Sequence, residues 1–251
     1  MKRMYILSVC VLLTTAAGCS NQEENTSTED KKVESNTASE IEQDPEALEI
    51  VENAIDTERN IESLFLHQEM IMKIEDDEEA PGDAIEEKLW IFPEEGENTH
   101  ERREASMFGN PLEYMISDGE EILIYTEGDD TAHLYPAESD DEVEFADEAS
   151  VMEERINTFD SRFVGEEKVN EYDTYHVALE QETESHEYWF EKDSYFTVRQ
   201  VSTMTTADTT EINELNVLEF DLDPEYEEEL FNFEEAVDEE TELIRMDDQE
   251  G

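Results

Sequence analysis

The sequence predicts an α+β domain in which one antiparallel sheet of about ten strands is accompanied by an N-terminal helix and short helical inserts. Three observations predict this class. Apolar residues recur with helical spacing between residues 44 and 60, and with a period of two in most segments between residues 64 and 220. Short turns rich in Gly, Pro, Asn and Asp join those segments. Because no break in composition divides residues 44–236, we expect a single domain there.

The opening helix is expected between Asp44 and Asn60. Asp44 is a favourable N-cap, Pro45 suits the first helical turn, and Glu46 complements the positive end of the helix dipole. The helical spacing predicts that one face is apolar, and that face is formed by Leu48, Val51, Ala54 and Ile55.

The strands follow in a regular order, and the Asp118-Gly119 dipeptide marks the clearest hairpin. The expected strands are Leu64–Ile74, Ile85–Phe92, Thr99–Met107, Leu112–Ile116, Glu121–Tyr125, His133–Tyr135, Arg162–Glu167, Tyr172–Gln181, Ser185–Glu191, Tyr195–Met204 and Thr209–Phe220. A short acidic helix is expected within Val143–Asn157. Near the end of the domain, the sequence predicts an apolar segment that packs back on the sheet, formed by Leu230, Phe231 and Phe233.

The N-terminus carries an export signal. Lys2 and Arg3 precede a run of about ten apolar residues, which is too short to span a bilayer, and small residues then lead to Cys19. The stretch Ala16–Cys19 resembles a bacterial lipobox, although its first position is more often Leu. The resemblance implies a signal peptide at residues 1–18, acylation of Cys19, and a protein anchored on the extracytoplasmic face of the cell membrane.

Two further segments flank the predicted domain. Residues 19–43 are polar and bury too little apolar surface to order themselves, so they are expected to form a flexible acidic tether. Residues 237–251 are expected to form a frayed acidic tail. Cys10 would leave with the signal and Cys19 would carry the anchor, so no intramolecular disulfide is expected.

The charge excludes one class of partner. The whole chain has 74 acidic and 15 basic residues and a formal net charge of −59, and loss of Lys2 and Arg3 would change it to −61. Nucleic acids bind basic surfaces, so a nucleic-acid partner is excluded. The composition favours a halophilic or otherwise salt-adapted exported protein, because salt screens repulsion between surface carboxylates.

Two regions, the first following the segment with Trp90, Pro93, Arg102 and Arg103 and the second made of four short stretches, resemble the LolA-like superfamily of lipoprotein carriers and lipoprotein-sorting proteins, including their membrane-anchored relatives. They are Met115–Tyr125, Phe163–Glu166, Tyr175–Leu179, Glu187–Glu191 and Leu230–Phe233. The shared pattern is an Asp-Gly hairpin before an aromatic strand, a Val-Gly turn, a Trp-bearing strand and a C-terminal Phe-x-Phe. The resemblance implies a strongly curved sheet, an incomplete β-barrel with an apolar concave side that shelters acyl chains in soluble carriers. A shuttling carrier must leave the membrane, whereas anchoring at Cys19 would tether this protein to it.

An incomplete barrel would leave apolar side chains available to a lipid chain, which gains about 0.8 kcal/mol per buried CH₂. The predicted ligand-lining residues are Met70, Met72, Leu89, Ile91, Leu123, Tyr125, Val177, Tyr188 and Phe190. An ordinary buried core has the same pattern and is the more common explanation. Arg102, Arg103 and Arg199 are either surface ion-pair partners or cations inside the concavity that bind backbone carbonyls or a ligand carboxylate.

Catalytic motifs are absent from the sequence. His186 and Glu187 begin a His-Glu-x-x-His pattern, but the second histidine is missing and the context is a strand. His176 and His186 could face each other on neighbouring strands and ligate a metal, but surface or hydrogen-bonded histidines are the more common explanation and are expected here. Neither a metal site nor a cofactor is expected. The main hypothesis is therefore a non-enzymatic exported lipoprotein that binds a hydrophobic or lipidated ligand, and the alternative is an envelope accessory or sensor protein that acts through protein contacts.

Overall fold

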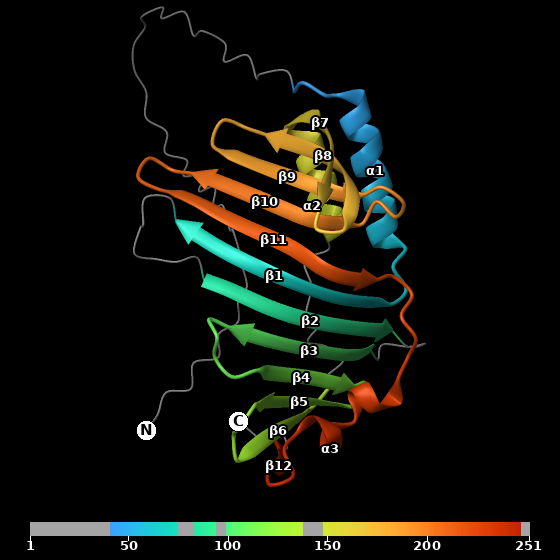
Figure 1. Cartoon of the computed structure of the whole chain (residues 1–251), viewed down its shortest axis with the longest axis vertical. Coiled ribbons are helices and arrows are strands. Elements are labelled where there is room, and N and C mark those ends of the chain that lie inside the picture. Colours follow the sequence, from blue (N-terminus) through green and yellow to red (C-terminus); the bar gives the residue numbers. More distant parts are fainter. Residues whose placement is uncertain (1–40, 75–82, 94–98, 138–147, 247–251) are drawn as a thin grey trace, which may run out of the picture. The chain divides into compact units, whose positions relative to one another are not determined.

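The computed structural model describes residues 41–74, 83–93, 99–137 and 148–246 (Figure 1). The strands are β1 (Leu64–Ile74), β2 (Asp83–Pro93), β3 (Thr99–Met107), β4 (Glu113–Asp118), β5 (Glu121–Thr126), β6 (Thr131–Pro136), β7 (Asp160–Val169), β8 (Tyr172–Glu180), β9 (Glu184–Glu191), β10 (Thr197–Thr205), β11 (Thr210–Asp221) and β12 (Glu242–Arg245). The helices are α1 (Pro45–Arg59), α2 (Glu148–Thr158), the 3₁₀ turn η1 (Glu228–Phe231) and α3 (Phe233–Ala236).

All twelve strands belong to one curved, unclosed sheet. Their order is β12-β6-β5-β4-β3-β2-β1-β11-β10-β9-β8-β7, so two meanders, β1–β6 and β7–β11, join through the antiparallel pair β1–β11. Only the β12–β6 pair among these strands is parallel. The α+β class predicted from the sequence is confirmed. The sheet has the incomplete-barrel architecture that the LolA-like resemblance implies (Figure 1).

Helix α1 begins where its cap predicts. One carboxylate oxygen of Asp44 accepts a hydrogen bond from the Glu46 N–H at 3.0 Å, and the other accepts from the Phe163 N–H in β7, also at 3.0 Å. The bonds from Phe163 and Glu46 lower the pKa of Asp44. Asp44 therefore caps the helix and links it to the sheet.

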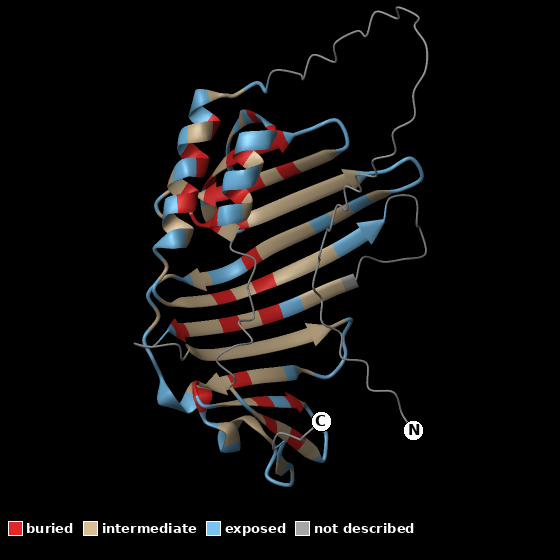
Figure 2. Ribbon diagram, turned by 180° about the vertical axis from the view of Figure 1, so that it is seen from behind, coloured by how far each residue is buried: buried red, intermediate tan, exposed pale blue. Residues whose placement is uncertain are grey.

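One face of the sheet is covered by α1 and α2 near β7, β8 and β9 (Figure 2). The buried core residues between the helices and the sheet are Ala47, Ile50, Val51, Ala54, Ile55, Ala149, Met152, Ile156, Phe159, Val177, Leu179, Tyr188 and Phe190. The helices thus cover one end of the sheet and are held there by hydrophobic packing.

The opposite face is covered at the other end of the sheet by the chain after β11. Phe231 of η1 is buried in a cluster with Phe92, Ile116 and Leu123, and Leu230 and Phe233 pack against its edge. The prediction that this apolar segment packs back on the sheet is confirmed. The two coverings therefore lie on opposite faces and at opposite ends of the sheet.

The C-terminal boundary predicted from the sequence is wrong. Residues 237–251 were expected to be a frayed tail, but Glu242–Arg245 form β12 and pair with Thr131–Leu134 of β6. Leu243 packs against the buried cluster beneath η1, so this short apolar stretch is stabilised by tertiary packing and not by local pattern. With β12, the sheet has twelve strands, one more than the eleven segments expected from the sequence. The signal peptide, Cys19 and nearly all of the tether, at residues 1–40, lie outside the described residues.

Candidate functional site

Four of the nine predicted lining residues share one face of the sheet. Leu89 pairs with Leu66 and Ile91 pairs with Leu64 across β1 and β2, and these positions have the same parity along β1 as Met70 and Met72. Cross-strand partners point to the same face, and alternate residues of a strand do so too. Met70, Met72, Leu89 and Ile91 therefore share one face of the sheet, although Leu89 is only 6% exposed and belongs to a buried cluster with Leu66 and Val217. That these four residues line a ligand site stays a prediction.

The same face remains apolar toward β5. Leu89 is opposite Arg103, Arg103 is opposite Met115, and Met115 is opposite Ile124. We call the apolar residues of this face the apolar patch: Met70, Met72, Ile85, Leu89, Ile91, Met107, Met115, Ile122 and Ile124. Met72 and Ile124 are each 48% exposed, so the patch is open to solvent at both ends.

Val177, Tyr188 and Phe190 lie on the same face as Met70 but beneath the helices. A continuous cross-strand row joins Met70, Leu215, Gln200, Tyr188 and Val177. All three predicted residues are completely buried in the core formed with α1 and α2. The Tyr188 hydroxyl is hydrogen-bonded to the Arg155 guanidinium, and burial raises the pKa of Tyr188. These three residues are core residues and not an open lining.

Leu123 and Tyr125 lie on the opposite face of the sheet. Leu123 pairs with Ile116, and Ile116 pairs with Arg102. Arg102 is the strand neighbour of Arg103, so its row of cross-strand partners points away from the face that carries the patch. Both predicted residues are buried beneath the C-terminal segment, and the Tyr125 hydroxyl donates to Asp238 Oδ2 at 2.8 Å. The prediction that they share a surface with Met70 and Leu89 is wrong, because their positions in β5 place them on the other face, beneath the C-terminal segment.

Polar residues cross the patch between its apolar ends. Glu87 is buried and accepts a hydrogen bond from Gln68 Nε2 at 2.7 Å, and Arg103 Nε lies 2.9 Å from Glu87 Oε1. Burial raises the pKa of the neighbouring Glu101, although the Arg103 charge opposes this effect. Arg103 thus forms an ion pair with a carboxylate of the same chain, which is the first of the two alternatives predicted for it.

The other two arginines singled out from the sequence lie on the opposite face. Arg102 Nη1 donates to the Leu230 backbone carbonyl at 2.7 Å. Arg199 pairs with Glu214 at 2.7 Å and lies over the Trp189 ring at 4.6 Å. Arg102 therefore makes the predicted bond to a backbone carbonyl, but it holds the C-terminal segment and not a ligand.

His176 and His186 do not face each other. His176 is opposite Trp189 and His186 is opposite Leu179, so the two imidazoles lie on different faces of β8 and β9. Both are hydrogen-bonded: His176 Nε2 lies 2.8 Å from Glu187 Oε2, and His186 Nδ1 lies 2.8 Å from Ser202 Oγ. The expectation of hydrogen-bonded histidines is confirmed, and the alternative in which they face each other is excluded because their strand positions differ in parity.

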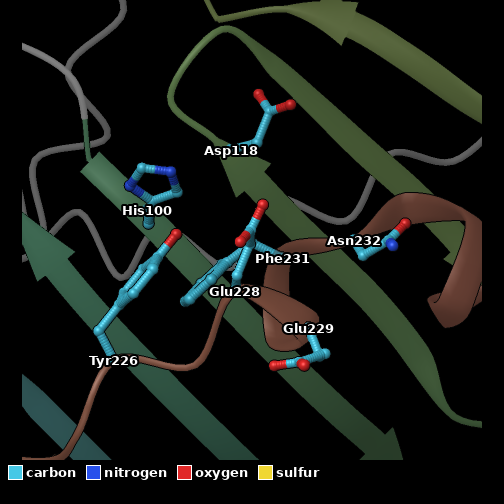
Figure 3. A pocket seen from close by; sticks show the side chains of 7 residues that line it. All are labelled: His100, Asp118, Tyr226, Glu228, Glu229, Phe231 and Asn232. Atoms are coloured by element: carbon cyan, nitrogen blue, oxygen red, sulfur yellow. The ribbon is translucent and has the colours of Figure 1, made fainter.

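A separate pocket of about 340 Å³ lies between the C-terminal segment and the sheet (Figure 3). No local sequence pattern indicates this pocket, since its walls come from positions more than a hundred residues apart. The lining residues are His100, Asp118, Tyr226, Glu228, Glu229, Phe231 and Asn232. His100 and Asp118 are cross-strand partners in β3 and β4, on the face opposite to the apolar patch.

Two further properties bear on the kind of site. Within the described ranges of the chain, no three His, Cys, Asp or Glu side chains are grouped as metal ligands. No helix among the described residues combines the length and the apolar composition needed to cross a membrane.

Comparison with families and curated sequences gives one partial match. The family described as "Predicted periplasmic protein (DUF2092)" matches residues 145–241, which is less than half of the chain. No curated protein matches the sequence.

Several solved structures are similar at low sequence identity. The Pseudomonas aeruginosa MucA/MucB complex matches with 11% identity and a TM-score of 0.44, over 76% of this chain and 62% of that chain. The Mycobacterium tuberculosis lipoprotein LppX matches with 11% identity and a TM-score of 0.42, over 73% and 98%. A LolA superfamily protein from Nitrosomonas europaea matches with 9% identity and a TM-score of 0.32, over 74% and 97%. The chain thus spans about three fifths of the length of the first of these.

Proposed function

We propose that the protein is an exported, membrane-anchored lipoprotein that binds the acyl chain of a lipid or of a lipidated protein on the apolar patch, without catalysis. The observation that carries this proposal is the patch itself. Met72 and Ile124 are each 48% exposed at its two ends, although they lie on the same face as the buried core beneath α1 and α2. Exposed large apolar residues gathered on one face of a sheet are typical of binding surfaces.

The side chains of the patch suit a ligand of variable length. Met70, Met72, Met107 and Met115 are unbranched, flexible and polarisable, so they adapt to irregular apolar groups. Covering ten methylene groups would contribute about 8 kcal/mol before the cost of ordering the ligand. An acyl chain also brings no negative charge to a chain whose net charge is −59.

The predicted anchor and the patch support one location. Acylation of Cys19 would hold the domain at the extracytoplasmic face of the membrane, within reach of membrane lipids. The family match, whose description names a periplasmic protein, supports export. A Cys19→Ala variant that stays membrane-bound with unchanged mass would contradict the anchor.

Lipid carried by the purified protein tests the ligand. The membrane-extracted wild type is expected to retain lipid in mass spectra of the native protein, and a Met72→Ser/Ile124→Ser variant is expected to retain several times less. Val164→Ser is the matched control, since Val164 is 42% exposed on β7, far along the sheet from the patch. Equal lipid in all three proteins would contradict binding at the patch.

A second function is favoured by the polar residues that cross the patch. The Gln68–Glu87–Arg103 contacts are specific and directional, as in protein interfaces, and they divide the apolar surface. In this case the domain is an envelope accessory or sensor protein that recognises another protein. Absence of lipid from wild-type protein extracted from membranes, together with capture of one defined envelope protein lost in the Met72→Ser/Ile124→Ser variant, would favour this function.

A further inference from the structure

The pocket beneath the C-terminal segment has a composition different from that of the apolar patch. Asp118, Glu228 and Glu229 supply three carboxylates, and Tyr226 and Phe231 supply two aromatic rings. The pocket lies on the opposite face of the sheet from the patch, and none of the patch residues lines it. Any ligand of the pocket is therefore separate from the proposed acyl chain.

The aromatic wall of the pocket is an ordered cluster. The rings of Tyr226 and Phe231 are nearly parallel, with centroids 5.4 Å apart and an interplanar angle of 7°. The His100 ring meets both at steep angles, with centroid distances of 5.4 Å to Tyr226 and 5.3 Å to Phe231 (Figure 3). Phe231 is buried and holds the cluster in place, whereas Tyr226 is 49% exposed and presents its ring to the pocket.

The carboxylates of the pocket differ in how strongly they are already engaged. Asp118 Oδ1 accepts hydrogen bonds from the N–H groups of Glu120 and Glu121 at 2.9 and 2.8 Å, so this residue shapes the β4–β5 turn. Glu228 and Glu229 lie on the exposed 3₁₀ turn beside the aromatic cluster. These carboxylates give the pocket a negative potential next to an aromatic face.

From the aromatic wall, the carboxylates and the 340 Å³ volume, we infer that this pocket binds an organic ammonium group. Aromatic faces attract cations, and alkylated ammonium groups lose little hydration when they contact a ring. A bare metal ion is disfavoured, because the carboxylates and imidazoles of the described residues form no metal-ligand group. The volume is at the lower end of the range for ligand pockets and suits a head group or one side chain.

Choline and its uncharged isostere 3,3-dimethyl-1-butanol test the inference on the full mature chain. Titration calorimetry at constant ionic strength is expected to show at least fivefold tighter binding of choline, because the two compounds differ only in charge. Lysine amide, the alkylammonium source expected in a peptide, is titrated in parallel to distinguish a head group from a side chain. Equal affinity for choline and the isostere would overturn the inference.

Three variants locate the binding. Tyr226→Leu keeps apolar volume but removes the ring, and it is expected to weaken choline binding about threefold to tenfold. Glu228→Gln is expected to weaken it about twofold to threefold, an effect that salt reduces. Glu225→Gln removes the same charge from an exposed residue outside the pocket and is the matched control. Identical effects of Glu228→Gln and Glu225→Gln would show general charge attraction and contradict a site.

These outcomes are independent of the proposed acyl-chain binding. The Met72→Ser/Ile124→Ser variant leaves every pocket residue intact and is expected to bind choline as the wild type does. Loss of choline binding in that variant would contradict a separate site on the opposite face.

Discussion

Arg102 and Arg103 are consecutive residues of β3, and their guanidinium groups lie on opposite faces of the sheet. Arg103 is 2.9 Å from Glu87 on the face of the apolar patch. Arg102 is 2.6 Å from Glu104 and 2.7 Å from the Leu230 carbonyl on the face covered by the C-terminal segment. Because successive side chains of a strand point to opposite faces, β3 supplies one cation to each face of the sheet.

Removing the Arg102 cation is expected to release the C-terminal segment. Its side chain is 13% exposed and that of Glu104 is 16% exposed, so Arg102→Met leaves a largely buried carboxylate and the Leu230 carbonyl unpaired. We expect a loss of about 2–4 kcal/mol in the free energy of unfolding, measured with urea. The control is Arg245→Met, whose 67%-exposed side chain pairs with Glu121 and is worth about 0–1 kcal/mol. Equal losses in both variants would contradict a holding role for Arg102.

Adjacent substitutions in β5 distinguish the core from the patch. Leu123 is completely buried beneath the C-terminal segment, so Leu123→Ala is expected to cost about 2–5 kcal/mol of stability. Ile124 is 48% exposed on the other face, and Ile124→Ala is expected to cost less than about 1 kcal/mol. Urea denaturation measures both. A large loss for Ile124→Ala would mean that the patch is part of the core.

Protonation of His186 is expected to destabilise the fold. Burial, reinforced by the nearby Arg155 charge, holds the pKa of His186 below its usual value of 6.5, and the Glu184 carboxylate opposes this effect. Below pH 6.5 the unfolded chain binds the proton more readily than the folded protein. The free energy of unfolding of the wild type therefore decreases as the pH falls. The His186→Gln substitution removes this titratable group, and with it the decrease in stability at low pH. The destabilisation caused by His186→Gln should therefore shrink between about pH 7.5 and pH 5.5. A difference in unfolding free energy between wild type and variant that stays constant over this range would show that protonation of His186 does not destabilise the fold.

The elements that local signals determine were predicted from the sequence. The Asp44 cap, the Pro45 first turn and the apolar spacing of the opening helix are all present in α1. Period-two alternation located the strands, because it reflects the geometry of a single strand. Those signals depend on residues only a few positions apart.

The distribution of residues between the two faces could not be predicted from alternation alone. Alternation shows that Leu123 and Tyr125 share a side of β5, but the segment that covers that side determines which face is buried. Here α1 and α2 cover one face and η1 covers the other, so the buried stripe changes face between β2 and β5. The pairing of β12 with β6 and the pocket at Tyr226 depend on the same long-range return of the chain.

Photo-cross-linking from two neighbouring residues of β1 tests the central claim most directly. Met72 lies on the face of the apolar patch and Lys73 on the opposite face, and both are exposed. A benzophenone amino acid is placed at either position in the membrane-anchored protein, and the products are identified by mass spectrometry. We expect cross-links to acyl chains from position 72 and several times fewer from position 73. Equal cross-linking from both positions, or none from position 72, would contradict binding of an acyl chain on the apolar patch.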